Sequence, residues 1–158
     1  MRRSPLLSAL LLCLSLSQAL GCAGLFSRKS PESVEILNRK ETSPAVSVKH
    51  ILISWSWLAP AYRKQGMSLD ARAENRTQSD AEKLSLGLLA RLHAGAPIEP
   101  LMKEYSEDPG SAASGRTYDV TPDSKFADDF IELALRLKVG ESGVVKSLFG
   151  LHVMQRVK

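Results

Sequence analysis

Three short blocks constrain the fold of this chain more than any other feature of its sequence. The first block is Val48-Lys49-His50-Ile51-Leu52-Ile53, and the last is Phe149-Gly150-Leu151-His152-Val153-Met154. Both are rich in β-branched and apolar residues, which is typical of strands, and each carries one histidine. The middle block runs from residue 105 to residue 115 and reads YSEDPGSAASG. Its Pro, Gly, Ser and Asp residues predict a loop between the two strands.

Helical patterns separate these blocks. Ser79 and Glu82 are spaced as a capping box, and leucines then recur every four residues from Leu84, which predicts an amphipathic helix. Gly95 and Pro97 are expected to end this helix. Further helices are predicted over 100–105 and 126–137, and strands over 46–54, 116–120, 144–148 and 151–157. The resulting order is β-α-α-β-α-β-β.

The N-terminus has the pattern of an export signal. Arg2 and Arg3 precede an apolar stretch over residues 6–20, which is too short to predict a membrane-spanning helix. Ala19-Leu20-Gly21-Cys22 resembles a lipobox, so we expect a lipoprotein signal over residues 1–21 with Cys22 as the lipidated residue. The alternative is ordinary signal cleavage that releases a soluble periplasmic protein. Because Ala23 rather than Asp follows the cysteine, we expect the outer membrane of a bacterial envelope rather than the inner one.

Composition excludes several classes of function. Loss of Arg2 and Arg3 with the signal would lower the net charge from +4 to +2, which is too small to indicate nucleic-acid binding. Cys13 would also be lost, so the mature chain could form no internal disulfide. The three histidines lack metal-ligand spacing and no phosphate-binding loop is present, so no metal or cofactor is expected. Residues 22–45 are polar and contain prolines, which predicts a tether, although Val34, Ile36 and Leu37 could form a short helix or a docking strip within it. Residues 46–158 are long enough for one domain.

Taken together and in this order, the three blocks resemble the parvulin (PpiC-type) family of peptidyl-prolyl isomerases. The resemblance covers roughly residues 46–158. It implies an α+β fold with a small four-stranded antiparallel sheet and about three surrounding helices. It also implies catalysis of proline isomerisation in exported envelope proteins on the periplasmic side, with unfolded or proline-containing polypeptides as partners.

The resemblance assigns a polar centre to His50, Asp108 and His152, with Ser147 beside the second histidine. Asp108 matches a loop position where the family carries cysteine or aspartate, and its negative charge is implied to lie near the substrate carbonyl. Each assignment has a structural alternative. The histidines could be buried residues that hold the sheet together, and Asp108 could be a turn residue that caps its own loop. His93 is expected to be an ordinary residue at a helix end.

The resemblance also implies a pocket for the proline ring. Phe126 and Phe130 are four residues apart on one helical face, Tyr118 takes the place of a family leucine, and Met154 shares a strand face with His152. The alternative is plain core packing.

Replaced glycines could weaken activity, and one segment is added to the family pattern. Gly115-Arg116-Thr117-Tyr118-Asp119 stands where the family commonly has Gly-Gly-Asp-Leu-Gly, so two glycines are lost. Residues 55–78 form an insertion that contains both tryptophans of the chain, Trp55 and Trp57. It could be a lip that grips clients, a contact with the bilayer interface, or a loop folded onto the domain's own surface.

The sequence therefore predicts a peptidyl-prolyl cis–trans isomerase that stabilises the twisted prolyl amide. The main alternative is a parvulin-fold module that binds extended peptides as a chaperone without isomerising them. A third possibility is a structural lipoprotein subunit of an envelope complex.

Overall fold

A computed structural model describes residues 30–158 of the chain. Four strands form one antiparallel sheet in the order β2-β1-β4-β3. The strands are β1 (Val46–Ile53), β2 (Tyr118–Val120), β3 (Ser142–Ser147) and β4 (Gly150–Arg156). The predicted α+β class and the order of the principal elements are confirmed, although six α-helices and two 3-10 turns occur in the described residues where about three helices were expected. The central pair β1–β4 carries both strand histidines.

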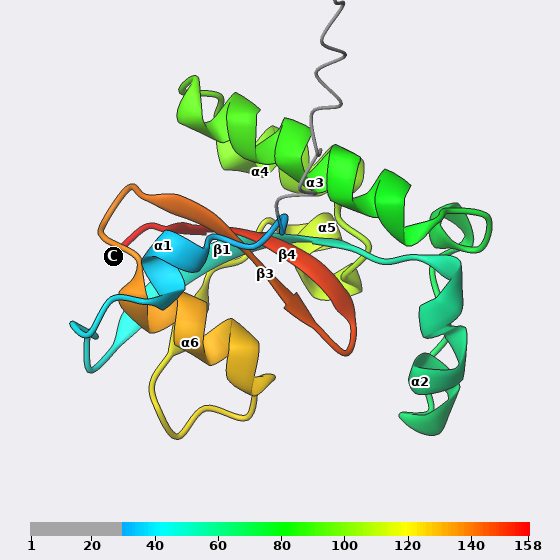
Figure 1. Ribbon diagram of the computed structural model, residues 1–158, viewed down its shortest axis with the longest axis horizontal. Helices are drawn as coiled ribbons and strands as arrows, with labels where there is room; N and C mark the ends of the chain where they lie inside the picture. The colour runs from blue at the N-terminus through cyan, green and yellow to red at the C-terminus, as the bar shows by residue number, and fades with distance from the viewer. Residues whose placement is uncertain (1–29) are drawn as a thin grey trace, which may run out of the picture.

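Helices cover both faces of the sheet (Figure 1). On one face lie α3 (Gln78–His93) and α4 (Ile98–Tyr105), which pack over Ile51, Ile53 and Val153. On the other face lies α6 (Asp128–Arg136), which packs over Val48 and Met154. This division follows from the pleat, because successive residues of a strand point to opposite faces.

The histidines follow the same alternation. His50 lies between Val48 and Leu52 on the α6 face, and in the register of β1 and β4 Leu52 faces His152 while His50 faces Met154. Both imidazoles are therefore buried beneath α6, with exposed fractions of 4% and 5%.

The helix boundaries differ from the predictions at two starts. Helix α3 is capped by Thr77, whose Oγ1 accepts a hydrogen bond from the Asp80 amide at 3.2 Å, so the predicted capping box at Ser79 is wrong. Thr77 has the extended backbone of an N-cap, whereas Ser79 already lies inside the helix. Helix α6 begins at Asp128, two residues after Phe126, so Phe126 precedes the helix that was expected to contain it.

The middle block is helical rather than a loop. Residues Pro109–Ser114 form the short helix α5, with Pro109 at its first position, where a missing amide hydrogen costs nothing. Gly115 ends the helix with φ +60°, a conformation that glycine adopts without strain. The turn that Asp108 was expected to cap is therefore the start of a helix.

Residues 33–45, which the sequence assigns to a tether, pack instead against the domain. Helix α1 (Val34–Leu37) buries Ile36 in the core under α6. The Ser33 amide donates to the Val144 carbonyl at 2.8 Å, and Arg39 forms an ion pair of 2.6 Å with Glu141. Apolar burial and these bonds fix the segment, so the folded unit begins near residue 33. The predicted signal and Cys22 lie outside the described residues.

The insertion is ordered and folds partly onto its own domain. It contains the 3-10 turn η1 (Ser56–Leu58), helix α2 (Ala59–Lys64) and the 3-10 turn η2 (Ala71–Ala73). Trp55 and Tyr62 are buried, whereas Trp57 is 81% exposed. Helix α2 stands away from the sheet at one end of the molecule (Figure 1). No helix among residues 30–158 has the length and apolar character needed to cross a membrane.

Candidate active site

A chain of polar contacts runs through the sheet beneath α6. Nε2 of His50 lies 3.3 Å from Oδ2 of Asp108, and the Tyr118 hydroxyl donates to the same oxygen at 2.5 Å. On the other side of the ring, Nδ1 of His50 lies 3.3 Å from Nδ1 of His152. Nε2 of His152 lies 2.7 Å from the Ser147 hydroxyl. The structure therefore brings together all four residues that the sequence assigns to the polar centre.

The hydrogen bonds of this chain follow one direction when both rings are neutral. An ionised carboxylate only accepts, so Nε2 of His50 donates to Asp108. Nδ1 of His50 then carries a lone pair and accepts from Nδ1–H of His152. The remaining lone pair of His152, on Nε2, accepts from the Ser147 hydroxyl, and Ser147 Oγ accepts from the Phe149 amide at 3.1 Å. Each donor in this series of hydrogen bonds from Phe149 to Asp108 therefore meets one acceptor.

Burial and hydrogen bonding set the ionisation of these groups. Burial alone raises the pKa of Asp108, but the hydrogen bonds from His50 and Tyr118 outweigh it and hold the pKa below its usual 3.8. Burial, with the hydrogen bond to Asp108, raises the pKa of Tyr118 to about 12. Burial, with repulsion from a charged His50, lowers the pKa of His152 to about 3. Near neutral pH the site holds one fixed negative charge, on Asp108, beside a neutral His152.

An open cavity of about 280 Å³ lies over this chain. Phe126 and Phe130 form its aromatic wall, with ring centroids 5.2 Å apart, and Phe130 meets the His50 ring edge-on at 5.1 Å. Tyr118 completes the wall, 5.9 Å from Phe126. Tyr118, Phe126 and Phe130 therefore line one cavity beside Asp108. Phe126 is 37% exposed at its mouth, while Phe130 is 3% exposed at its base.

Two of the assigned residues do not reach the cavity. Met154 is fully buried in the core under α6 and does not line it, so its assignment to the substrate pocket is wrong. It shares a strand face with His152 and is paired with His50, but its side chain is packed in the core cluster with residues such as Val48 and Leu133. Ser147 lies behind His152 and contacts the cavity only through that ring. His93 is remote from the site, with Nε2 3.3 Å from the Ser142 carbonyl oxygen.

Asp108 has two structural roles at once. Its carboxylate caps α5 by accepting from the Ser111 amide at 2.9 Å, and it also accepts from Tyr118 and His50. Gly110 is needed at this turn, because a Cβ there would lie 2.8 Å from the Tyr118 hydroxyl. One conformation of Asp108 therefore caps a helix and also lines the cavity.

Comparison with known proteins identifies this arrangement. The sequence profile of the PPIC-type PPIase domain matches residues 33–157. The chain belongs to the parvulin family. Its match begins where the structure shows the folded unit to begin, at Ser33.

Parvulin-containing relatives and solved structures agree with this membership. The chain is 40% identical over 75 residues to foldase protein PrsA of Geobacillus kaustophilus, covering 47% of this chain and 27% of that protein. It is 31% identical over 111 residues to chaperone SurA of Pseudomonas fluorescens, covering 70% of this chain and 22% of that protein. The chain thus spans only about a quarter of the length of these relatives.

Two solved structures share the fold. The solution structure of TbPIN1 matches with a TM-score of 0.58 and 28% identity, over 73% of this chain and 99% of that one. The peptidyl-prolyl isomerase ESS1 from Candida albicans matches with a TM-score of 0.58 and 23% identity, over 73% of this chain and 63% of that one. The parvulin fold is therefore established for residues 33–157.

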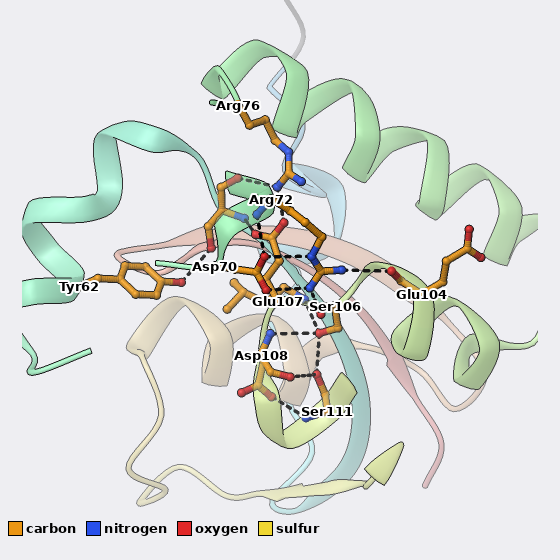
Figure 2. A network of polar contacts seen from close by, with 11 residues as sticks. Tyr62, Asp70, Arg72, Arg76, Glu104, Ser106, Glu107, Asp108 and Ser111 are labelled. Carbon is orange, nitrogen blue, oxygen red and sulfur yellow. Dashed lines mark hydrogen bonds and ion pairs between the residues drawn. The ribbon is translucent and has the colours of Figure 1, made fainter. Parts of the chain in front are cut away.

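This parvulin ties its insertion to the active-site segment with a polar network that the sequence did not predict (Figure 2). Glu107, whose side chain is 1% exposed, forms an ion pair with Arg76 and accepts from the Ser54 amide at 2.6 Å. Arg72, held by Asp70, donates to the Ser106 carbonyl at 2.8 Å. The backbone on the N-terminal side of Asp108 is thus fixed by two arginines of the insertion.

The same segment bonds to the free side of β1. The Glu107 amide donates to the Leu52 carbonyl at 2.9 Å, and the Leu52 amide donates to Ser106 Oγ at 3.1 Å. Strand β2 pairs with β1 only as far as Val48, so the active-site segment takes up the pairing that β2 does not provide. Acidic Glu107 directly before Asp108 was the only sequence signal of this arrangement.

Sequence reasoning also missed several residues of the cavity wall. Met67 reaches the cavity from the insertion, and Lys125 lies at its mouth beside Arg116, which the sequence had already marked as a departure from the family. Leu52 and Phe149 complete the apolar lining. Met67 had no signal, because a single methionine in a polar insertion has no periodic pattern. Among residues 30–158 no cluster of His, Cys, Asp and Glu has the arrangement of a metal site.

Proposed function

We propose that this domain is a peptidyl-prolyl cis–trans isomerase that acts on unfolded or proline-containing polypeptides. The observation that carries the proposal is the apolar cavity of about 280 Å³, walled by Phe126 and Phe130 and bordered by the ionised Asp108. Its volume and aromatic wall suit a proline ring, and its polar edge suits the amide attached to that ring. The names of the relatives, a foldase and a chaperone, support the same class of substrate.

The chemistry needs no bond to be broken. Rotation about a prolyl amide faces a barrier of about 18–20 kcal/mol, most of which reflects loss of amide resonance. The twisted amide carries less negative charge on its oxygen than the planar one, so a fixed negative charge nearby destabilises the planar state more. Asp108 supplies that charge, and His50 and Tyr118 keep it ionised and in place. His152 and Ser147 act through His50 as positioning residues.

The proposal includes export and lipid anchoring. Arg2, Arg3, the apolar stretch over 6–20 and Cys22 support a lipoprotein of the bacterial envelope, facing the periplasm, in the outer rather than the inner membrane. Mass spectrometry of the protein from the membrane fraction tests this: a diacylated Cys22 as first residue is expected. A mature N-terminus at another residue would contradict it.

A second candidate function is a peptide-binding chaperone module without isomerase activity. It is favoured by the replacement of the family glycines, because Arg116 and Tyr118 now stand at the cavity wall. It is favoured also by the four donors that already occupy the Asp108 carboxylate, two backbone amides, Tyr118 and His50. Such a site would hold an extended segment but would lack a free charge to act on the amide.

Exchange spectroscopy by NMR on short Xaa-Pro peptides separates the two functions. We expect the protein to accelerate cis–trans exchange and the variants Asp108→Ala and Phe130→Ala to lose most of the acceleration. Glu132→Ala, which removes an exposed carboxylate from α6, is the matched control and should behave as wild type. Peptide binding without acceleration would establish the chaperone module. Neither binding nor acceleration would favour the structural lipoprotein subunit.

A further inference from the structure

Two cations stand at the mouth of the cavity without acidic partners. Arg116 and Lys125 both line the cavity and are exposed, and neither forms an ion pair with any residue of 30–158. The one carboxylate of the lining, Asp108, already accepts from His50, Tyr118 and the Ser111 amide. No carboxylate of residues 30–158 thus neutralises the positive charge at the mouth.

The guanidinium of Arg116 is held in position rather than free in solvent. Its Cζ lies 4.5 Å from the centroid of the Tyr118 ring, and that ring is fixed by the hydrogen bond to Asp108. Stacking on an aromatic face restricts the side chain and leaves the N–H groups at the edge of the guanidinium available. These donors match both oxygens of a carboxylate.

Lys125 extends the same positive surface along the cavity. It directly precedes Phe126, whose ring packs against Tyr118 at 5.9 Å. The acidic residues between Arg116 and Lys125 in the sequence, Asp119 and Asp123, are exposed and do not line the cavity. A peptide whose proline packs in the cavity against the wall of Phe126 and Phe130 therefore passes its flanking side chains over two cations.

We propose that this site selects polypeptides that carry a carboxylate side chain, Asp or Glu, next to the proline. The inference rests on the proposed function, since it assumes that the proline ring occupies this cavity. Arg116 and Lys125 are the specificity-determining residues, and Asp108 remains the charge that acts on the amide. Because both cations are exposed, the selectivity is moderate and weakens as salt screens it.

The test is cis–trans exchange by NMR in peptides that differ only beside the proline. One series carries Glu, Gln or Lys before the proline, and a second carries the same three residues after it. We expect acceleration to be about two- to fivefold greater for Glu than for Gln in one series, as exposed ion pairs allow, and least for Lys. Arg116→Ala with Lys125→Ala should abolish the difference, and Arg116→Glu should reverse it toward Lys.

Matched controls come from the opposite face of the sheet. Arg91 also lies over a tyrosine ring, 5.6 Å from the centroid of Tyr105, and Lys103 is an exposed lysine on α4. Arg91→Ala and Lys103→Ala should keep the preference for Glu. Equal acceleration of all peptides, or a preference that survives in the Arg116→Ala, Lys125→Ala protein, would overturn this inference and leave the isomerase intact. Absence of acceleration for every peptide would overturn the proposed function instead.

Discussion

The Tyr118 hydroxyl donates a 2.5 Å hydrogen bond to the same carboxylate oxygen of Asp108 that faces His50. Tyr118 stands where the family commonly has a leucine, so this donor is a property of this chain. Tyr118 thereby forms part of the cavity wall and also holds the Asp108 carboxylate in place.

Removal of the Tyr118 hydroxyl should change the pKa of Asp108 more clearly than it changes the stability of the fold. In Tyr118→Phe, Asp108 loses one of its donors, so its pKa should rise toward the usual 3.8. The ring and its packing on Phe126 remain, so stability should fall by no more than the 1.5–3 kcal/mol, roughly, that a hydrogen bond to a charged group contributes. Titration of the Asp108 carboxyl by NMR, with exchange rates measured beside it, checks both effects. An unchanged pKa would show that the remaining donors, His50 and the backbone amides of α5, are enough to hold the carboxylate ionised.

Acid should destabilise the domain through His152. The pKa of this histidine is about 3 in the folded protein and near 6.5 when unfolded, so between these values the unfolded state binds more protons. Stability is therefore fully present above about pH 6.5 and falls as the pH drops toward 3, by up to about 1.4 kcal/mol per pH unit. Denaturant unfolding from pH 7 to pH 4 measures the slope. In His152→Asn this part of the slope should vanish; a slope equal to wild type would assign it to other groups.

The buried ion pair of the insertion should matter for both folding and activity. Glu107→Gln leaves Arg76 without its anionic partner in a buried setting, for which about 3–5 kcal/mol of destabilisation is typical. The exposed pair Lys49–Glu99 is the matched control, and Glu99→Gln should cost less than about 1 kcal/mol. Equilibrium unfolding compares the two variants. Similar small costs would mean that the insertion is not anchored through Glu107.

The two phenylalanines of the cavity should separate catalysis from stability. Phe130 is buried, so Phe130→Ala should cost about 3–5 kcal/mol as well as activity. Phe126 is 37% exposed at the mouth, so Phe126→Ala should leave stability within about 1 kcal/mol of wild type. Its acceleration of prolyl exchange should nevertheless fall severalfold. Full activity in Phe126→Ala would place the proline ring elsewhere.

Local patterns in the sequence predicted the sheet well. All four strands occur within a few residues of their expected bounds, and alternation correctly put Met154 on the same strand face as His152. The polar centre followed from the resemblance, and its contacts in the structure agree. Met154 shows the limit of the method, because sharing a strand face with His152 does not say how deep in the sheet a side chain lies.

Contacts between residues far apart in the sequence could not be predicted. Arg76 and Glu107 are 31 positions apart, and Arg39 and Glu141 are 102 apart, so no local period relates them. The packing of residues 33–45 had only a faint signal, in Ile36 and its apolar neighbours. The polar, proline-containing composition of residues 33–45 predicts a tether, and only the bonds that Ser33 and Arg39 form with distant residues show that the segment belongs to the domain.

The bonds between the active-site segment and Leu52 carry a further consequence. Beyond Val48, the outer backbone groups of β1 would present an unpaired strand edge if residues 106 and 107 moved away. Such edges recruit strands from other chains and begin aggregation. A protein that handles unfolded clients would be especially exposed to that pairing. If the domain acts on unfolded polypeptides, as proposed, residues 106 and 107 therefore also cover the β1 edge against pairing with strands of those polypeptides.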